Sequence, residues 1–328
     1  MKSLLPHGPK TAFLLILPLL LMAVTVSLDG QSKPEKAKRD SNQAVYTRPT
    51  DPSLYVGSET CKTCHADMPT KDFFKNYEDS PHYVTTLDTK KGPEWHGCEA
   101  CHGPGKAHVE SGGDKTKIFT FKDASAQETS ARCLGCHQYG EEHGNFARSI
   151  HLQNGVGCID CHDPHHPKES QKLLKVSQPT LCYGCHLDKK QDFNRPFHHK
   201  VNEGLVKCTD CHNPHGGFQA HQLRATGSQD LVCFTCHTDK AGPFVYEHEA
   251  VKVEGCTACH MPHGSSNPRL LKRAQVNLLC LECHAFSADA GGPPATPTFH
   301  NQAQKYQACT MCHTAIHGSN SSKFLFTP

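Results

Sequence analysis

Twenty cysteines dominate the chemistry of this chain, because every one of them belongs to the same five-residue pattern, Cys-x-x-Cys-His. The pattern occurs ten times. Positions i, i+3 and i+4 share one face of a helical turn, so two thiols and an imidazole can act on one group. The motif cysteines are Cys61, Cys64, Cys98, Cys101, Cys133, Cys136, Cys158, Cys161, Cys182, Cys185, Cys208, Cys211, Cys233, Cys236, Cys256, Cys259, Cys280, Cys283, Cys309 and Cys312. The motif histidines are His65, His102, His137, His162, His186, His212, His237, His260, His284 and His313.

This pattern is the attachment signature of c-type haem. The thiols form thioethers to the porphyrin edge, and the histidine binds the iron from one side. Other uses of paired cysteines fit less well. A zinc ribbon needs no histidine after every second cysteine, a disulfide framework would not repeat one short motif, and a redox dithiol needs only one copy. The sequence therefore predicts ten covalently bound c-type haems as cofactors.

Histidines outside the motifs are also placed regularly. The motifs fall into five consecutive pairs, in an internal repeat of roughly 50 residues. In each pair a histidine follows the first motif by 11 to 17 residues, and another closely follows the second motif. We expect these imidazoles to fill the second axial positions of the irons. They are His82, His151, His198 (with His199 as the alternative), His248 and His300 after the first motifs, and His108, His165, His215, His263 and His317 after the second.

Chain length limits which iron these distal histidines can reach. His165 follows His162 by three residues, which span at most ~10 Å when extended. Imidazoles on opposite faces of one haem, with metal–nitrogen bonds of about 2 Å, separate their backbones by roughly 12 Å. We therefore expect His165, and likewise His215 and His263, to bind a neighbouring haem. The histidines after the first motifs have enough slack for either choice.

Methionine, which raises the reduction potential as an axial ligand, is scarce. Only Met68, Met261 and Met311 follow residue 28. We therefore expect bis-histidine ligation throughout, with low-spin irons at comparatively low potential. An iron with both axial positions filled leaves no place for substrate, so the sequence predicts no catalytic residues and no enzymatic activity.

The remaining composition indicates how the motifs are held. Hydrophobic residues make up 36% and aromatic residues 7% of the 328 residues, too few for a normal core. Prolines soon after the motifs should end the motif helices within a turn, and other helices, such as 70–77 and 125–132, look short. The predicted fold class is a multihaem cytochrome c: short α-helices and long loops wrapped around a row of haems, with little or no β-sheet. A haem-free chain should be largely unfolded.

The N-terminal residues predict export. Lys2 and Lys10 precede an apolar run, as in a secretory signal peptide. An uncleaved anchor is less favoured because the run is short and contains Pro18. No cysteine precedes Cys61 to carry a lipid. We expect a signal peptide (1–28), a flexible leader (29–52), a decahaem cytochrome domain of five two-haem repeats (53–318), a tail (319–328) and a periplasmic location.

Charge is nearly balanced. The net charge is +2 over the whole chain, from 34 basic and 32 acidic residues. A nucleic-acid partner is not expected, because the chain has no basic stripe. Each haem would add two propionates and make the assembled protein acidic. Contacts with redox partners should therefore be transient and salt-sensitive.

Phrases such as Cys-Glu-Ala-Cys-His-Gly-Pro-Gly (98–105) and Cys-Thr-Asp-Cys-His-Asn-Pro-His-Gly (208–216) carry a family resemblance. With the five motif pairs and the export signal, they resemble the MtrA/DmsE-type periplasmic decahaem c-type cytochromes over roughly residues 53–318. The resemblance implies a bis-histidine electron carrier for extracellular or outer-membrane respiration. Its implied partners are an inner-membrane or periplasmic donor cytochrome, an outer-membrane β-barrel that can surround the carrier, and an outer-surface cytochrome or reductase. The first unit departs from the family pattern around His108, where Gly-Pro-Gly-Lys-Ala-His replaces the short Pro-His form.

Two other functions compete with an electron conduit. A multihaem reductase, acting for instance on nitrite, hydroxylamine or tetrathionate, needs an open iron, often marked by an altered motif such as Cys-x-x-Cys-Lys. This sequence has no altered motif. An extracellular cytochrome filament subunit would need a distal ligand from another chain, whereas this chain has surplus histidines of its own.

Overall fold

The computed structural model describes residues 46–68, 73–75, 77–88, 90–140, 142–224, 227, 230–284 and 307–326. All of them belong to one unit, Asn42–Pro328. The predicted signal peptide, most of the predicted leader and His300 lie outside the described residues. None of the described helices has the length and apolar character that a membrane-spanning helix needs.

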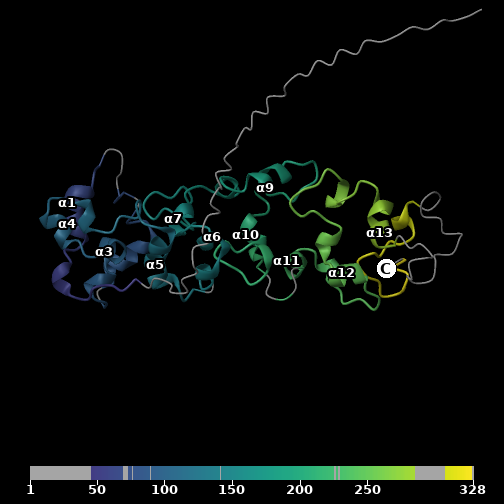
Figure 1. Ribbon diagram of the computed structural model, residues 1–328, viewed down its shortest axis with the longest axis horizontal. Coiled ribbons are helices and arrows are strands. Elements are labelled where there is room, and N and C mark those ends of the chain that lie inside the picture. Colours follow the sequence, from purple (N-terminus) through teal and green to yellow (C-terminus); the bar gives the residue numbers. More distant parts are fainter. Residues whose placement is uncertain are drawn as a thin grey trace, which may run out of the picture. The chain divides into compact units, whose positions relative to one another are not determined.

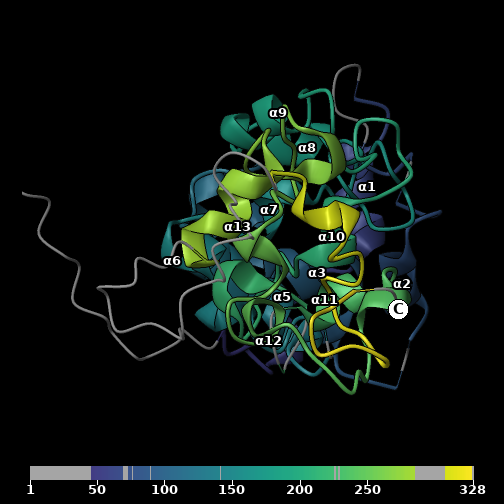
Figure 2. The ribbon, with the colours of Figure 1, turned by 90° about the vertical axis from the view of Figure 1, so that its right-hand side faces the viewer.

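Short helices joined by loops make up the described residues (Figures 1 and 2). The longest, α5, has twelve residues. The α-helices are α1 (Ser58–His65), α2 (Val84–Leu87), α3 (Gly97–His102), α4 (Lys106–Glu110), α5 (Ala126–His137), α6 (Ile150–Gln153), α7 (Cys158–Cys161), α8 (Thr180–Tyr183), α9 (Leu187–Asp192), α10 (Cys208–Cys211), α11 (Leu231–Phe234), α12 (Glu249–Val253) and α13 (Val276–His284). The 3-10 helices are Pro52–Leu54, Pro81–Tyr83, Pro93–Trp95, Lys115–Lys117, Phe146–Arg148, Ala220–Gln222, Thr238–Lys240, Cys256–Ala258, Pro268–Leu270 and Cys309–Met311.

Extended structure in the described ranges is limited to isolated bridges, so the predicted fold class of short helices and loops with little or no sheet is confirmed. The predicted helix at 125–132 is confirmed as part of α5, which begins with a capping box between Ser125 and Glu128. The predicted helix at 70–77 is wrong for its described residues, 73–75 and 77, which form bends and turns.

The motif helices begin and end for local reasons. In α7 the Asp160 carboxylate accepts a hydrogen bond from the Gly157 N–H at 2.6 Å, which satisfies a donor that the helix start leaves free. In α10 Asp210 does the same for Lys207 at 2.7 Å. Both helices end at the second motif cysteine, shortly before a proline that cannot continue them.

The two motif helices of a unit are tied to each other by a polar side chain just ahead of the first motif. The Ser58 hydroxyl accepts a hydrogen bond from the Cys98 N–H at 3.2 Å, and the Asp230 carboxylate accepts one from the Cys256 N–H at 3.1 Å. This link holds the start of the second motif against the first. Ser130 (3.4 Å, from the Cys158 N–H) and Gln178 (3.3 Å, from the Thr209 N–H) make the equivalent contacts.

A loop of similar form follows the second motif in successive units. After α7, the Lys175 N–H donates to the Cys161 carbonyl at 3.0 Å and the Asp163 N–H donates to Leu173 at 2.7 Å. The same two bonds recur after α10 and after the 256–258 helix. Residues in the left-handed region close the turns, among them Leu173 (φ 52°), Gln222 (φ 55°) and Leu270 (φ 60°).

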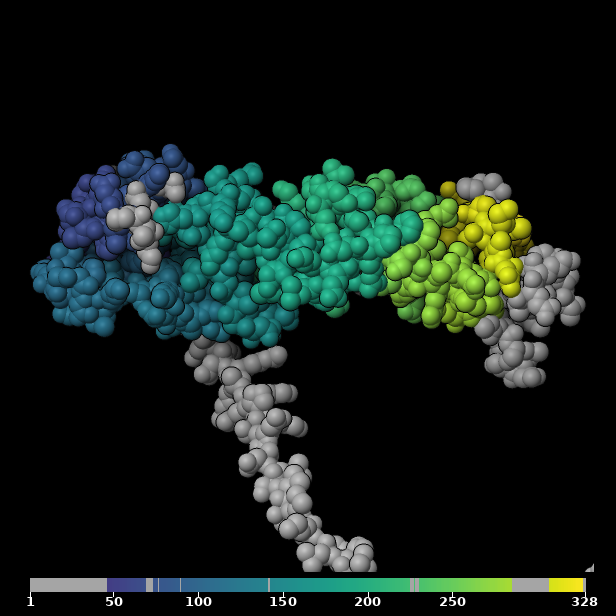
Figure 3. Space-filling view, turned by 90° about the horizontal axis from the view of Figure 1, so that it is seen from above, coloured from purple at the N-terminus to yellow at the C-terminus, as the bar shows by residue number. Residues whose placement is uncertain are grey.

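Apolar burial within the described part is slight. Its buried hydrophobic side chains are Ala100, Phe146, Leu152, Leu173, Leu174, Phe193, Val201 and Ala315. The largest fully buried side chains there are threonine and serines, which contribute little hydrophobic stabilisation. Within this unit, parts of the chain that follow one another in sequence also lie next to one another in space, as the order of the colours shows (Figure 3). Successive motif pairs are therefore neighbours.

Candidate haem-binding sites

The motif cysteines are free thiols, and the first cysteines of each motif pair lie in contact. A hydrogen bond between the two thiols raises the pKa of Cys61 and lowers that of Cys98 to about 6. The same contact recurs in all five units and brings the attachment points of two haems side by side. The further pairs are Cys133–Cys158, Cys182–Cys208, Cys233–Cys256 and Cys280–Cys309.

Second cysteines are neighbours between one unit and the next. Burial raises the pKa of the Cys101 thiol, and the nearby Cys136 thiol raises it further. First-cysteine contacts within units therefore alternate with electrostatic interactions between the second cysteines of neighbouring units, in sequence order. The other pairs of second cysteines that interact electrostatically between units are Cys161–Cys185, Cys211–Cys236 and Cys259–Cys283.

Nine of the motif histidines each lie beside one histidine from outside the motifs. The ring centroids of these pairs are 6.0 to 6.3 Å apart. The tenth motif histidine, His313, is described, but its predicted partner His300 is not. The pairs are His65–His108, His102–His165, His137–His82, His162–His215, His186–His151, His212–His263, His237–His199, His260–His317 and His284–His248.

These separations fit an iron held between two imidazoles. Two metal–nitrogen bonds of about 2 Å and two ring radii of about 1.1 Å place the centroids about 6.2 Å apart. The angle between the ring planes ranges from 11° in His248–His284 to 89° in His82–His137. Ring stacking would select an orientation, whereas axial ligands can rotate about the nitrogen–iron axis. By contrast, His143 and His215 lie only 4.5 Å apart, as rings in direct contact do.

The pairing crosses unit boundaries. The histidine after a second motif lies beside the motif histidine of the preceding unit, as His165 does beside His102. The histidine after a first motif lies beside the motif histidine of the next unit, as His151 does beside His186. In the first unit, by contrast, His108 lies beside His65 of its own unit. Histidines three residues apart, such as His162 and His165, therefore lie at different sites, as their short separation along the chain predicted.

Burial favours the neutral form of six distal imidazoles. It lowers the pKa of His215 and of His263 to about 4. It also lowers the pKa of His82, His165, His248 and His317. Neutral imidazole is the form that binds a metal, so these side chains are ready to bind iron at neutral pH.

Backbone carbonyls in the loops after the second motifs accept hydrogen bonds from the Nδ1 atoms of the motif histidines and so orient these side chains. The sequence did not predict this role. Since a carbonyl only accepts, each Nδ1 must donate and Nε2 is left for a metal. The recurring triplets 173–175, 222–224 and 270–272 (Leu-Leu-Lys or Gln-Leu-Arg) are the sequence signal that could have revealed these loops. The Nδ1 bonds are His102–Phe119 (3.0 Å), His162–Lys172 (2.8 Å), His212–His221 (2.8 Å), His260–Arg269 (2.8 Å) and His313–Phe324 (2.7 Å).

Three distal histidines are oriented by the backbone next to another distal histidine. His151 Nδ1 donates to the Pro214 carbonyl at 2.9 Å, and His199 Nδ1 donates to that of Pro262 at 2.6 Å. His248 hydrogen-bonds to the backbone of Ile316. Pro214, Pro262 and Ile316 immediately precede distal histidines, so one stretch of backbone orients the ligands of two neighbouring sites.

The structure distinguishes His198 from His199. His198 uses both ring nitrogens within its own loop: Nδ1 bonds to the Arg195 carbonyl at 2.6 Å and Nε2 to the Glu203 carboxylate at 3.0 Å. His199, the alternative, is the one beside His237. Two of the histidines left outside the nine pairs lie close to paired ones: His143 is 5.3 Å from His137, and His166 is 6.2 Å from His165.

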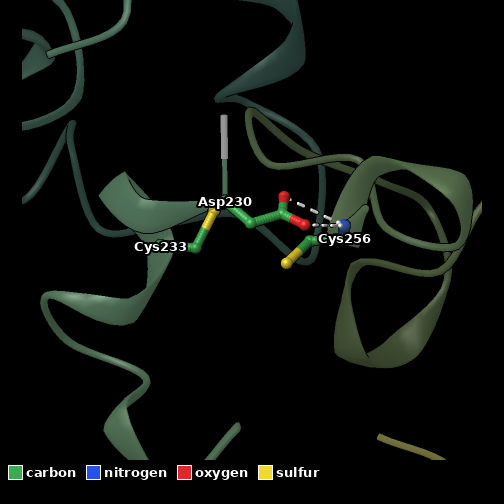
Figure 4. A group of neighbouring side chains, drawn as sticks. All are labelled: Asp230, Cys233 and Cys256. Carbon is green, nitrogen blue, oxygen red and sulfur yellow. Dashed lines mark hydrogen bonds between the residues drawn. The ribbon is translucent and has the colours of Figure 1, made fainter. Parts of the chain in front are cut away.

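One cluster outside the histidine pairs could hold a metal ion. Oxygen and sulfur atoms of Asp230, Cys233 and Cys256 lie within 4.8 Å of one another (Figure 4). Structural zinc takes four ligands, whereas this cluster has three. Both cysteines belong to Cys-x-x-Cys-His motifs, and the carboxylate already accepts from the Cys256 N–H. The cluster is therefore better explained as the joint between the two motifs.

Comparison with known proteins gives the same chemistry. A family model described as a doubled CXXCH motif matches residues 151–191, 198–242 and 248–289. A second model, for cytochrome c554 and c-prime, matches residues 106–163.

Two curated proteins and one solved structure are similar to the chain. Multiheme cytochrome MtrA of Shewanella baltica is 30% identical over 273 residues, which cover 80% of this chain and 79% of that protein. Cytochrome c-552 of Desulfotalea psychrophila is 32% identical over 98 residues, 27% of this chain and 19% of the relative. The undecaheme cytochrome from the S-layer of Carboxydothermus ferrireducens has 17% identity and a TM-score of 0.32, covering 60% of this chain and 59% of that one.

Proposed function

Since the chain belongs to the MtrA family of multihaem c-type cytochromes, which bind haem c through Cys-x-x-Cys-His motifs, we propose that it binds ten haems, one at each motif, and conducts electrons along residues 53–318 across the periplasm. Haem supplies a group that accepts and donates single electrons. The protein attaches each group, sets its two axial ligands and places it next to the following one.

The alternating proximity of motif thiols, within units and between them, carries this proposal. Cys61 touches Cys98 within the first unit, and Cys101 neighbours Cys136 of the second. Because each thioether anchors a porphyrin edge, contacts of this kind along the chain bring consecutive edges close together. They support a continuous path in sequence order.

The histidine pairs support bis-histidine ligation. Among the described residues, nine motif histidines have a distal partner at the expected separation, and we assign His300 to the tenth, His313. No iron then has a free position for a substrate, so we propose an electron carrier without enzymatic turnover. His199 replaces His198 in this ligand set.

We further propose the partners that the family resemblance implies. Electrons would enter from an inner-membrane or periplasmic cytochrome and leave, through an outer-membrane β-barrel around the carrier, to an outer-surface cytochrome or reductase. The export signal at 1–28 would place the chain in the periplasm.

The mass of the purified holoprotein, together with its pyridine haemochrome spectrum, tests the central claim. We expect ten haem additions to the processed polypeptide and no turnover of nitrite, hydroxylamine or tetrathionate. Fewer than ten haems would contradict the one-per-motif assignment. Steady-state reduction of any of these substrates would instead favour a reductase, and electron microscopy showing filaments would favour a filament subunit.

Exchanging His199 for alanine should turn one low-spin iron into a high-spin iron, because the iron at His237 loses its second imidazole. The neighbouring exchange, His198→Ala, should leave all irons low-spin, since His198 bonds within its own loop. Electron paramagnetic resonance of the two oxidised variants distinguishes them. A high-spin signal from His198→Ala alone would reverse the ligand assignment.

A further inference from the structure

Two arginines that form no ion pair with the described residues lie at the junction between the second and third motifs. Arg48 Nη2 donates to the Cys136 sulfur at 3.9 Å. Arg132, the residue before Cys133, donates to the Cys101 carbonyl at 3.2 Å. Neither arginine forms an ion pair in the described part of the chain.

Aromatic rings lie against both guanidinium groups. The Arg48 guanidinium lies 4.1 Å from the Trp95 ring centroid and 5.3 Å from that of Tyr46. The Arg132 guanidinium lies 3.6 Å from the Tyr46 ring centroid and 3.9 Å from that of Phe119. The Arg48 Nε is buried and has no hydrogen-bond partner in the part of the chain that the structure describes. Weak screening in such surroundings lets a charge act on a nearby haem more strongly than it would in water.

The same haem site differs from its repeats in a second way. The distal histidines of the fifth, seventh and ninth motifs each hydrogen-bond to a backbone carbonyl. His82, which lies beside His137 of the third motif, has a buried Nδ1 with no hydrogen-bond partner among the described residues. A bond from Nδ1 to a carbonyl makes an imidazole a stronger donor and so favours the oxidised iron. That stabilisation is missing at His82.

In the fourth unit, a negative charge lies where its own two motifs meet. There the Asp230 carboxylate lies within 4.8 Å of the Cys233 and Cys256 sulfurs (Figure 4) and is buried. A negative charge disfavours adding an electron, and a positive charge favours it. Arg48 should therefore raise the potential of the haem beside it, and Asp230 should lower the potentials of the haems at Cys233 and Cys256.

We propose that the haem of the third motif has the highest reduction potential of the third, fifth, seventh and ninth haems, and that Arg48 is the residue that raises it. This inference rests on the proposed function, because it assumes haem at the third motif with His82 and His137 as axial ligands. Of these four haems, an electron passing along the chain would reside longest on the third.

The third haem has its own spectroscopic label. Its two imidazole planes lie 89° apart, compared with 69°, 60° and 11° for the fifth, seventh and ninth. The relative orientation of the axial rings sets the splitting of the iron d orbitals, and perpendicular rings give a low-spin signal with an unusually large maximal g value. The intensity of that signal during a redox titration reports on the third haem.

In the wild-type holoprotein, this signal should be lost before those of the other three haems as the potential is lowered. Arg48→Met, which removes the charge and keeps an unbranched side chain over Trp95, should shift its midpoint downward. Arg48→Lys should retain most of the wild-type value. Arg273→Met is the matched control, because Arg273 is paired with Glu282 and should leave the midpoint unchanged.

A wild-type signal that titrates with or after the other three would overturn the proposal, even if no variant folds. An unshifted midpoint in an Arg48→Met protein with its full haem count would remove Arg48 from the explanation. Failure of the proposed function is a distinct result: the mass would then be one haem short, or the third iron would be high-spin.

Discussion

Removal of the fifth haem should interrupt conduction from one end of the chain to the other. In the double variant Cys182→Ala/Cys185→Ala no thioether can form at this motif. The fifth motif has neighbours on both sides, because Cys182 contacts Cys208 and Cys185 interacts electrostatically with Cys161. Electron transfer rates fall steeply with the distance between porphyrin edges, so a step that skips one haem should reduce the conductance by orders of magnitude.

Holoprotein bridged between two electrodes through tags at its two ends would give this conductance. Cys309→Ala/Cys312→Ala is the matched control, because it also removes one haem but at the last motif, and nine haems remain in series. We expect the terminal variant to conduct far better than the central one. Equal conductance of the two, at equal haem count, would show that electrons do not follow the motifs in order.

The sequence predicted the fold class and the candidate ligands because both depend on local spacing. Cys-x-x-Cys-His places its groups on one helical turn, and a proline soon after it ends the helix, as in α7 and α10. The scarcity of large apolar residues agreed with the slight burial in the described residues.

Pairing could not be predicted, because it depends on contacts between units. Spacing excluded His162 with His165 but did not select His102 as the neighbour of His165. The choice between His198 and His199 depends on where Arg195 and Glu203 fold back, which adjacent positions in a sequence do not reveal. The thiol contacts and the carbonyls that accept from Nδ1 are likewise products of loop conformation.

The haem-free chain should have no cooperative unfolding transition, whereas the holoprotein should unfold cooperatively. The few buried apolar side chains of the described part, such as Leu152 and Phe193, do not offset the conformational entropy lost on folding, at about 1–2 kcal/mol per residue. In the proposed holoprotein, haem would supply the missing apolar surface, and histidines such as His165 and His215 would connect one unit to the next through iron. Folding is then coupled to cofactor attachment, as in small metal domains.

Expression of the full chain with and without the haem-attachment machinery allows this comparison. Urea titrations followed by far-UV circular dichroism should give a sigmoidal curve for the holoprotein and a gradual change for the haem-free chain, which should also elute at a larger hydrodynamic radius. His198→Ala serves as the control holoprotein, since it removes a histidine that bonds only within its own loop. A compact haem-free chain with a sharp transition would mean that the polypeptide forms a sufficient core by itself and that its folding does not depend on haem attachment.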